Sequence, residues 1–457
     1  MDPPVGQTTV DANRSGLTEE RLPAGSRAGT PGIVLLLDNG CAVSRAIPVT
    51  AAGLELGRGS PPGCFVQDDW VSRAHLRVHH AEGEWRFEDL GSRNGSYVNG
   101  GLIQDASSVS GDVLVRLGRS LCWARQDISA HLEAAPAAAR PNAGEGQEVG
   151  PVLGAALRRA WRELRVAVRA SDTLLVTGPS GAGKELAARA YHQVAHGDNA
   201  HAPFVAVNCA TISSSIAERL LFGTKRGAYS GATQDAVGFV QAASGGTLFL
   251  DEVAELEPAV QAKLLRVLEN REVTPLGSTQ TQPVQLRVCV ATLRDLRAEV
   301  TAGRFREDLY YRIGRPAIRI PPLTERLDEL PVLAERTLAS IDPRLRPGTD
   351  LVEACALRPW PGNVRELIGE LRHAAFAALD NKALLVGAEF LAPDAGRALS
   401  EGEKPDLAVG SRPRSATAWP SDDAIRAALE RDGGNVSAAA RALGLHRNQL
   451  RRWLSRQ

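Results

Sequence analysis

A glycine-rich loop that ends in a lysine, GPSGAGK at residues 178–184, indicates phosphate-binding chemistry. The loop follows the apolar run TLLVT and precedes a helical pattern, which is the context in which such a loop binds a nucleotide. Its backbone N–H groups and the helix N-terminus would neutralise the phosphates, and the lysine would add a positive charge. We therefore expect ATP to be bound by Gly178, Pro179, Ser180, Gly181, Ala182, Gly183, Lys184 and Glu185.

Two acidic residues follow the apolar run LFL further along the chain. Asp251 is placed to hold Mg²⁺ through water, and Glu252 is placed to orient and deprotonate the water that attacks the γ-phosphate. The alternative is a glycine turn followed by an unrelated acidic strand end. Because both features occur in the order that ATP hydrolysis requires, we favour an ATPase with Asp251 and Glu252 as catalytic residues.

The segment from about 150 to 390 resembles the AAA+ ATPase domain of sigma-54-dependent transcription activators, the bacterial enhancer-binding proteins. The resemblance rests on GPSGAGKELAARAYH, FVAVNCA, LLFGTKRGAYSGA, GGTLFLDEVAEL, GRFREDLYYRI, PPLTER and WPGNVREL. It implies that Asn208 restrains Glu252 until the γ-phosphate is sensed, and that Arg365 is a second sensor on a helical lid. It also implies a homo-oligomeric ring, six subunits in this family, in which Arg306 and Arg312 reach the neighbouring subunit's site.

The chain departs from this family at the first sensor. The family has Asn where this chain has Leu293, and a leucine side chain cannot hydrogen-bond to a water or a phosphate. The neighbouring Thr292 is the candidate substitute. A ring that assembles but does not remodel sigma-54 therefore stays open as an alternative.

The loop GAYSGA, residues 227–232, has glycine near both ends and an aromatic ring and a hydroxyl at its centre. It resembles the family's GAFTGA loop, which contacts the sigma factor, with Tyr and Ser in place of Phe and Thr. Glycine permits the backbone to swing, and an exposed ring supplies contact area. We expect contact with the sigma-54 RNA polymerase holoenzyme through Gly227, Ala228, Tyr229, Ser230, Gly231 and Ala232.

Residues 422–457 have the spacing of a helix-turn-helix. Asn435 caps one helix, Gly444 ends it, and a basic second helix begins at about His446. The segment resembles the Fis-type module that ends these activators. We therefore expect enhancer DNA to be read by His446, Arg447, Asn448, Gln449, Arg451 and Arg452. The alternative is a basic amphipathic helix that dimerises.

Polar residues near the N-terminus form a tripartite pattern: Gly57-Arg58, SRAH at 72–75, and DLGSRNGS at 89–96 followed by VNG. The pattern resembles the forkhead-associated (FHA) domain, a β-sandwich that binds phosphothreonine. A phosphate requires an arginine fork with hydroxyl and amide donors. The expected binding residues are Arg58, Ser72, Arg73, Arg93, Asn94 and Asn99, and His75 is expected to brace the loop. A purely structural or dimerising sandwich is the alternative.

Several folded segments must position these residues, so the predicted fold class is multidomain. Short strands between turns predict a β-sandwich, and alternating strands and helices predict an α/β P-loop core with a parallel sheet. The expected segments are a disordered 1–31, an FHA β-sandwich at 32–127, a linker at 128–150, an AAA+ α/β core at 151–326, an α-helical lid at 327–392, a linker at 393–420 and a small all-α helix-turn-helix domain at 421–457.

The composition fits a cytoplasmic regulator. Lys and Arg number 53 and Asp and Glu number 53, so no overall field favours nucleic acid or a membrane. The six cysteines lack metal-like spacing, which fits thiols in a reducing compartment. No apolar run approaches the ~20 residues that span a bilayer.

These patterns together predict a sigma-54-dependent regulator that binds enhancer DNA, hydrolyses ATP and is controlled by phosphothreonine. A Ser/Thr protein kinase would mark a partner protein or the chain's own first segment, where the candidates are Thr8, Thr9, Thr18 and Thr30. One alternative is a DNA-binding regulator whose AAA+ core only oligomerises. Another is a phosphopeptide-binding scaffold with a vestigial ATPase.

Overall fold

The computed structural model describes residues 29–60, 66–104, 106–133, 152, 154–197, 199, 201–230, 232–398, 426–428 and 431. By its internal contacts the chain divides into one unit of residues 1–399 and another of residues 400–457. The predicted segment 1–31 is described only from residue 29, and the predicted linker 393–420 only up to residue 398. The predicted helix-turn-helix lies outside the described residues apart from 426–428 and 431.

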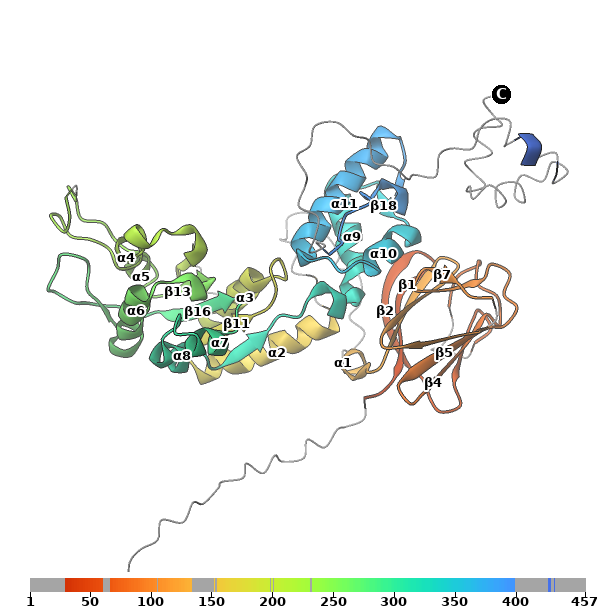
Figure 1. Ribbon diagram of the computed structural model, residues 1–457, viewed down its shortest axis with the longest axis horizontal. Coiled ribbons are helices and arrows are strands. Elements are labelled where there is room, and N and C mark those ends of the chain that lie inside the picture. The colour runs from red at the N-terminus through yellow and green to blue at the C-terminus, as the bar shows by residue number, and fades with distance from the viewer. Residues whose placement is uncertain are drawn as a thin grey trace, which may run out of the picture. The chain divides into compact units, whose positions relative to one another are not determined.

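The N-terminal part is a sandwich of two antiparallel sheets (Figure 1). One sheet has the strand order β2-β1-β10-β9-β6-β7, and the other has the order β3-β4-β5-β8. The strands are β1 (Gly32–Asp38), β2 (Cys41–Pro48), β3 (Leu54–Leu56), β4 (Leu76–Ala81), β5 (Glu84–Asp89), β6 (Ser96–Val98), β7 (Gly101–Leu102), β8 (Ala106–Ser110), β9 (Val113–Leu117) and β10 (Ser120–Arg125). The predicted FHA sandwich is confirmed.

Strand β1 is buried on both faces. Ile33 and Leu35 pack in the core between the two sheets, with Trp85 and Phe87 of β5. Val34 and Leu36 alternate with them and belong to a second core on the outer side of the same sheet. A strand that is apolar without alternation is one that is covered on both sides.

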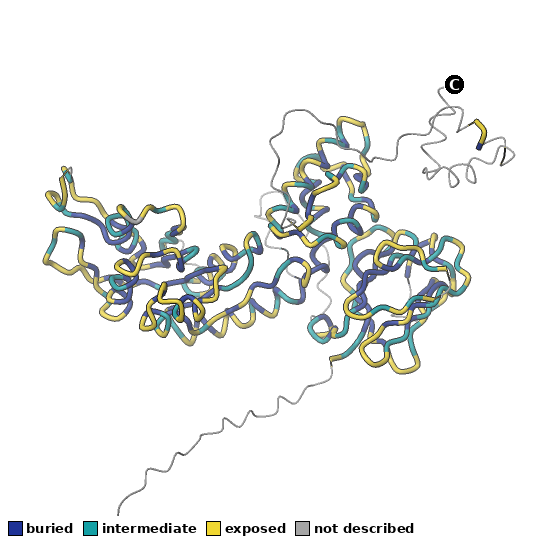
Figure 2. Tube along the Cα trace, in the orientation of Figure 1, coloured by how far each residue is buried: buried dark blue, intermediate teal, exposed yellow. Residues whose placement is uncertain are grey.

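The AAA+ core is a five-stranded parallel sheet in the order β12-β13-β16-β11-β17. Its strands are β11 (Thr173–Thr177), β12 (Phe204–Asn208), β13 (Thr247–Asp251), β16 (Arg287–Thr292) and β17 (Ala317–Arg319). Most of their residues are buried (Figure 2), because successive side chains enter different cores on the two faces. Since parallel strands end at the same edge, the residues that follow them are brought together there.

Helices cover both faces of this sheet, as the alternating pattern predicted. On one face pack α2 (Ala155–Ala170) and α3 (Lys184–His196). On the other pack α4 (Ser214–Phe222), α5 (Phe239–Ala242), α6 (Pro258–Asn270), α7 (Leu296–Thr301) and α8 (Glu307–Ile313). A short hairpin is formed by β14 (Glu272–Val273) and β15 (Gln282–Pro283).

The lid contains α9 (Leu330–Ala339), α10 (Thr349–Ala356) and α11 (Asn363–Asp380). The helical pattern predicted here is interrupted by one short parallel pair, β18 (Arg346–Pro347) with β19 (Leu385–Val386). A further helix, α1 (Ser129–Leu132), occupies the start of the range that composition assigned to a linker. Among the described residues, no helix has the length and apolarity to cross a membrane.

Candidate ATP site and phosphopeptide site

The glycine-rich loop connects β11 to α3 and needs a backbone that only glycine adopts easily. Gly181 and Gly183 have φ values of +69° and +107°, in the left-handed region. The loop turns the chain so that Lys184, the first residue of α3, is buried beside it. Its Nζ donates a hydrogen bond of 3.1 Å to the carbonyl of Gly178. The ammonium is thus held at the mouth of a loop of backbone N–H groups, where a phosphate would bind.

Glu252 lies next to this ammonium, with Oε1 at 3.4 Å from Lys184 Nζ. It follows Asp251, the last residue of β13, which is paired in register with Asn208 at the end of β12. Burial is the main cause that raises the pKa of Asp251, and the charge of Glu252 adds to the effect. The amide oxygen of Asn208 accepts from the Ala210 N–H at 3.0 Å. All four side chains contribute to one cavity.

The segment predicted to contain the first sensor reaches Glu252 through its backbone. The N–H of Leu293 donates to Glu252 Oε2 at 3.1 Å, while the Leu293 side chain is 53% exposed. The hydroxyl of Thr292, which is fully buried, accepts from the Arg294 N–H at 2.9 Å. Thr292 and Leu293 do not line the cavity that holds Lys184. A sensing role for Thr292 stays a prediction.

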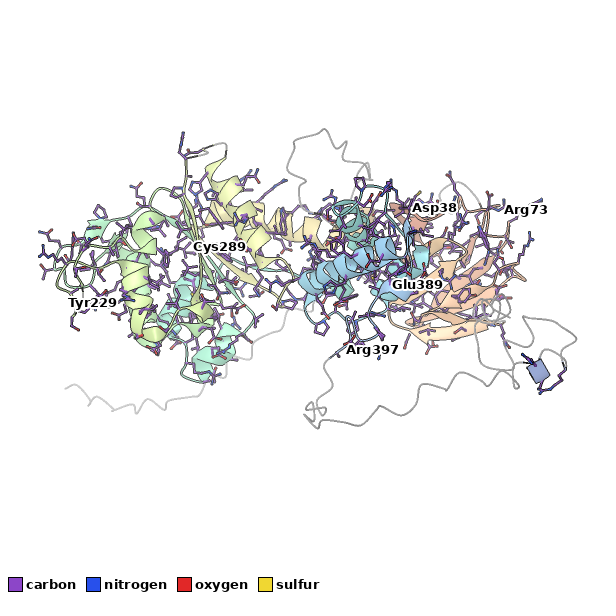
Figure 3. All side chains as sticks on the ribbon, turned by 90° about the horizontal axis from the view of Figure 1, so that it is seen from above. Asp38, Arg73, Tyr229, Cys289, Glu389 and Arg397 are labelled. Atoms are coloured by element: carbon purple, nitrogen blue, oxygen red, sulfur yellow. The ribbon has the colours of Figure 1, made fainter. Side chains whose placement is uncertain are left out.

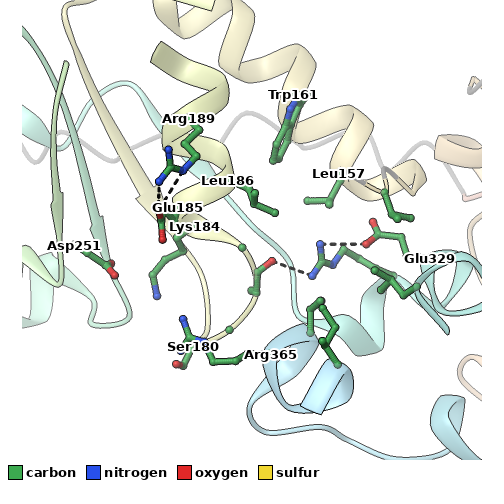
Figure 4. A pocket seen from close by; sticks show the side chains of 18 of the residues that line it. Leu157, Trp161, Ser180, Lys184, Glu185, Leu186, Arg189, Asp251, Glu329 and Arg365 are labelled. Carbon is green, nitrogen blue, oxygen red and sulfur yellow. Dashed lines mark hydrogen bonds and ion pairs between the residues drawn. The ribbon is translucent and has the colours of Figure 1, made fainter. Parts of the chain in front are cut away.

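The cavity has a volume of about 560 Å³ and opens between the phosphate loop and the lid (Figure 4). Lys184, Asp251 and Arg365 border it, and Arg365 comes from α11 of the lid. Its residues from the predicted set are Ser180, Gly181, Ala182, Gly183, Lys184, Glu185, Asn208, Asp251, Glu252 and Arg365. Gly178 and Pro179 line a neighbouring cavity, with Leu293. The structure therefore brings most of the predicted ATP-site residues together.

Sequence reasoning missed a buried ionic cluster at the edge of this cavity. Arg326 is 1% exposed, and it donates from Nη2 to the carbonyl of Ala182 in the phosphate loop at 3.0 Å. Its Nη1 lies 3.4 Å from the carboxylate of Glu329, and burial raises the pKa of Glu329 to about 7. Glu329 in turn accepts from the Gly154 N–H at 2.9 Å. The signal was present in TERLDEL, but charged residues in such a run are usually exposed.

The two arginines predicted to act in a neighbouring subunit do not line this cavity. Arg306 forms two hydrogen bonds to Asp308, at 3.0 and 2.7 Å, and is 44% exposed. Arg312 donates to the carbonyl of Leu268 at 3.1 Å. Arg306 precedes α8 and Arg312 lies in it, and neither borders the cavity that contains Lys184 of its own chain.

The loop around Tyr229 is closed by backbone hydrogen bonds, of which Gly227 N–H to Ala232 O at 2.9 Å joins its ends. Gly227 has a φ of +84°. The Tyr229 side chain is 42% exposed (Figure 3), and its hydroxyl accepts from Arg219 at 3.1 Å. Ser230 is also exposed, and Gly231 lies outside the described residues. The aromatic tip is thus presented at the surface.

The predicted phosphopeptide residues lie on loops at the ends of the sandwich strands. Arg58 is exposed, and its Nε donates to the carbonyl of Val71 at 2.7 Å. The Ser72 hydroxyl accepts from the Arg93 N–H at 3.2 Å, which joins two of the loops. Asn94 donates to the carbonyl of Trp70 at 2.7 Å. These contacts link the segments that carry Arg58, Ser72, Arg93 and Asn94.

Arg73 is exposed beside these loops, as Figure 3 shows, and Asn99 is exposed at a turn with φ of +46°. The Asn99 amide oxygen accepts from the Leu114 N–H at 3.0 Å. His75 is fully buried, with Nδ1 accepting from the Ser72 N–H at 2.9 Å and Nε2 at 3.3 Å from Gly95 O. Burial lowers the pKa of His75, so the ring is neutral and braces two loops, as predicted.

The residues predicted to read DNA, 446–452, lie outside the described residues. Their segment is matched by the model of the Fis family of bacterial regulatory proteins, at residues 422–456. The sigma-54 interaction domain matches residues 153–319, and the FHA domain matches residues 54–118. The chain therefore carries the three predicted segments in the predicted order.

Curated relatives match the region around the ATPase core. The chain is 42% identical over 301 residues to the hydrogenase transcriptional regulatory protein HoxA of Bradyrhizobium diazoefficiens, covering 63% of this chain and 60% of HoxA. It is 41% identical over 303 residues to the Nif-specific regulatory protein of Azotobacter vinelandii, covering 64% of this chain and 56% of that protein. It thus spans less than two thirds of these relatives' length.

The match to the transcriptional regulatory protein ZraR of Escherichia coli covers a larger fraction of the relative. The two sequences are 38% identical over 314 residues, which is 66% of this chain and 67% of ZraR. Among solved structures, NtrX from Brucella abortus in complex with ADP is 31% identical with a TM-score of 0.49, over 68% of this chain and 69% of NtrX. By its sequence the chain belongs to the family of sigma-54-dependent transcriptional regulators.

Proposed function

We propose that this protein binds enhancer DNA and uses ATP hydrolysis in an oligomeric ring to remodel sigma-54 RNA polymerase, under control of phosphothreonine recognised by its FHA domain. The observation that carries the proposal is the approach of Lys184 Nζ to Glu252 Oε1, 3.4 Å, at the phosphate loop. A cation that binds phosphate and a carboxylate that activates water are the two groups that hydrolysis of a nucleoside triphosphate requires.

Glu252 is held by two donors in this arrangement, Lys184 and the Leu293 N–H. A γ-phosphate at the loop would compete for the ammonium of Lys184, because two anions then share one cation. Glu252 would be released from that partner and left to orient a water molecule. The position of Asn208 beside Asp251 supports a part in the same restraint.

Mg²⁺ fits this site by the chemistry of its donors. Asp251 offers a half-buried carboxylate next to the phosphate loop, and oxygen is the ligand atom that Mg²⁺ prefers. When bound, the ion would neutralise phosphate charge. The residues that would hold it are Asp251, through water, together with the phosphates.

Assembly is supported by Arg306 and Arg312, which are absent from the cavity of their own chain. An arginine supplied by a neighbour stabilises the transition state and makes hydrolysis depend on ring formation. The exposed ring of Tyr229 supports contact with the sigma factor. The Fis-family match at 422–456 supports enhancer binding.

The proposal is tested by ATP hydrolysis of the full chain across a protein concentration series. We expect a rate per subunit that rises cooperatively with concentration, and ATP-dependent open-complex formation when sigma-54 RNA polymerase and a promoter are added. A rate near zero at concentrations where sedimentation shows a ring would contradict the motor. The protein would then be a DNA-bound regulator whose AAA+ core only oligomerises.

A further inference from the structure

The outer face of the six-stranded FHA sheet packs on the ATPase lid of the same chain. Strands β1, β9 and β10 supply apolar side chains that point away from the sandwich core. The shared core includes Val34, Leu36, Leu37, Leu114, Leu121, Trp123 and Ile128 from the FHA side, and Leu327, Leu330, Ala334, Leu338, Leu351, Val352 and Cys355 from the lid side. All of these are less than a tenth exposed. Moving the two parts apart would expose this apolar surface to water.

Polar contacts fix the register of this packing. Arg116 of β9 forms an ion pair with Glu353 of α10, with Nε at 2.6 Å from Oε2. Both side chains are largely buried, at 22% and 11% exposed. The Thr349 hydroxyl donates to the carbonyl of Arg119 at 3.0 Å. An ion pair that is largely removed from water is costly to break on one side only, because the remaining charge is left without a partner.

One turn of the predicted phosphopeptide site approaches the same lid. A Cβ built on Gly100, next to the predicted phosphopeptide residue Asn99, would lie 3.1 Å from Leu357 Cδ1 at the end of α10. A Cβ built on Gly118, which follows β9, would lie 2.7 Å from the Cβ of Trp70, a residue of the loop that precedes Ser72. The turn that carries the predicted phosphopeptide residue Asn99 therefore lies beside the lid.

A chain of buried polar groups leads from the FHA side to the phosphate loop. His131 of α1 has Nε2 at 3.5 Å from Asp328 Oδ2. The same carboxylate oxygen accepts from the N–H of Ala155, the first residue of α2, at 2.7 Å. Glu329 beside it is paired with Arg326, which donates to Ala182 of the phosphate loop. The 3-10 turn Leu327–Glu329 thus contacts the FHA module and the nucleotide site at once.

We propose that the FHA module controls the ATPase through the lid, as a docked part of it, so that docking sets the affinity of the chain for nucleotide. The proposal rests on the proposed function in one respect, that the loops of this module hold phosphothreonine. A ligand of the FHA module that favours or disfavours the docked arrangement then changes the affinity for nucleotide. Because coupling between two sites is reciprocal, nucleotide changes the affinity for that ligand by the same factor.

The test is charge reversal across the ion pair in the full chain. The variants are Arg116→Glu, Glu353→Arg and the double reversal, with Arg77→Glu on the other sheet as the matched control, since Arg77 pairs within the sandwich. The probe is a fluorescent ADP, whose Kd is measured by titration. Hydrogen–deuterium exchange is followed in parallel over β9 and α10.

We expect each single reversal to increase exchange in both elements and to shift the Kd for ADP by about fivefold or more, in the same direction. The double reversal should return both readouts to within about twofold of the unmodified chain, because it restores an ion pair. Arg77→Glu should leave both unchanged. If a single reversal lowers the yield of folded protein, Arg116→Gln and Glu353→Gln provide the milder pair.

Increased exchange with an unchanged Kd for ADP would overturn the proposal, because docking would then have no effect on nucleotide binding. Unchanged exchange would also overturn it, because the parts would not be docked in solution. Neither readout needs hydrolysis, DNA, sigma-54 or a phosphopeptide. The proposed function can therefore fail while this coupling stands, and the coupling can fail while hydrolysis and remodelling stand.

Discussion

The backbone N–H of Leu293 donates a hydrogen bond of 3.1 Å to Oε2 of Glu252, so the segment where the family has a polar sensor still contacts the carboxylate that we propose as catalytic. This contact does not depend on the residue type at 293, because every residue except proline offers the same donor. The exposed leucine side chain takes no part in it.

From this contact we expect Leu293→Ala to keep ATP hydrolysis within about twofold, since the backbone donor survives. Leu293→Asn adds an amide that reaches water or phosphate, and it should also stay within about twofold if the backbone contact suffices. The measurement is phosphate release per subunit at saturating ATP. An increase of about tenfold or more in Leu293→Asn would show instead that the missing amide limits this enzyme.

Substitutions at Glu252 and Lys184 should distinguish ATP hydrolysis from ATP binding. Glu252→Gln is isosteric and keeps an acceptor for the Leu293 N–H, so we expect it to bind ATP while hydrolysis falls about 10²-fold or more. Lys184→Ala removes the buried ammonium that faces the phosphate loop. We therefore expect this variant to bind ATP more weakly. Both are measured by titration with a fluorescent nucleotide and by phosphate release. Equal loss of affinity in the two variants would contradict these roles.

Tyr229 should matter for the partner and not for the chemistry. We expect Tyr229→Ala to reduce sigma-54 open-complex formation by about tenfold or more, because an exposed aromatic anchor is removed from a contact surface. ATP hydrolysis should stay within about twofold. Tyr229→Phe is the matched control: it loses only the hydrogen bond from Arg219 and keeps the ring. A Tyr229→Phe variant as defective as Tyr229→Ala would point to the hydroxyl as the contacting group.

Arg58 should carry phosphate recognition in the FHA loops. We expect Arg58→Ala in the full chain to weaken binding of phosphothreonine peptides by about tenfold to a hundredfold, the effect of losing hydrogen bonds to a charged group. Suitable probes are peptides of residues 1–31 phosphorylated at Thr8, Thr9, Thr18 or Thr30, compared with their unphosphorylated forms. Arg77→Glu serves as the control, because Arg77 is outside the predicted phosphopeptide site and pairs with Glu55 and Glu88. Equal binding of phosphorylated and unphosphorylated peptides would contradict the site.

Local sequence patterns predicted the features that depend on residues close together in the chain. The phosphate loop, the two acids after β13 and the brace at His75 are of this kind, because each depends on residue types at short, fixed spacing. The alternation of strands and helices likewise predicted the parallel sheet and its two covered faces.

Long-range relationships were not predictable in the same way. The run GIVLLLD indicated one strand of a sandwich, and nothing in its residue types shows that the lid covers Val34 and Leu36 on the outer face. Arg326 and Glu329 read as surface charges, because their burial depends on α2, the phosphate loop and the lid meeting around them. The hydrogen bond from the Leu293 N–H to Glu252 was not predictable, because the type of a side chain does not indicate what the backbone N–H contacts.

The buried cluster around Glu329 predicts a pH dependence of stability. Burial raises the folded-state pKa of Glu329 from an ordinary value near 4.5 to about 7, so the folded protein holds this proton more tightly than the unfolded chain. The stabilising contribution is complete below pH 4.5 and is lost as the pH rises to about 7, because ionising the carboxylate then costs more in the folded state.

Glu329→Gln should remove this slope, because the amide oxygen still accepts from the Gly154 N–H but has no proton to release. We expect the free energy of unfolding of the variant to vary less than that of the unmodified chain between pH 5 and about pH 7, as measured by urea denaturation. Glu389→Gln, at a carboxylate outside this cluster, is the control for a change of net charge. An identical slope in Glu329→Gln and the unmodified chain would show that Glu329 is already ionised across this range, and that Arg326 compensates its burial in full.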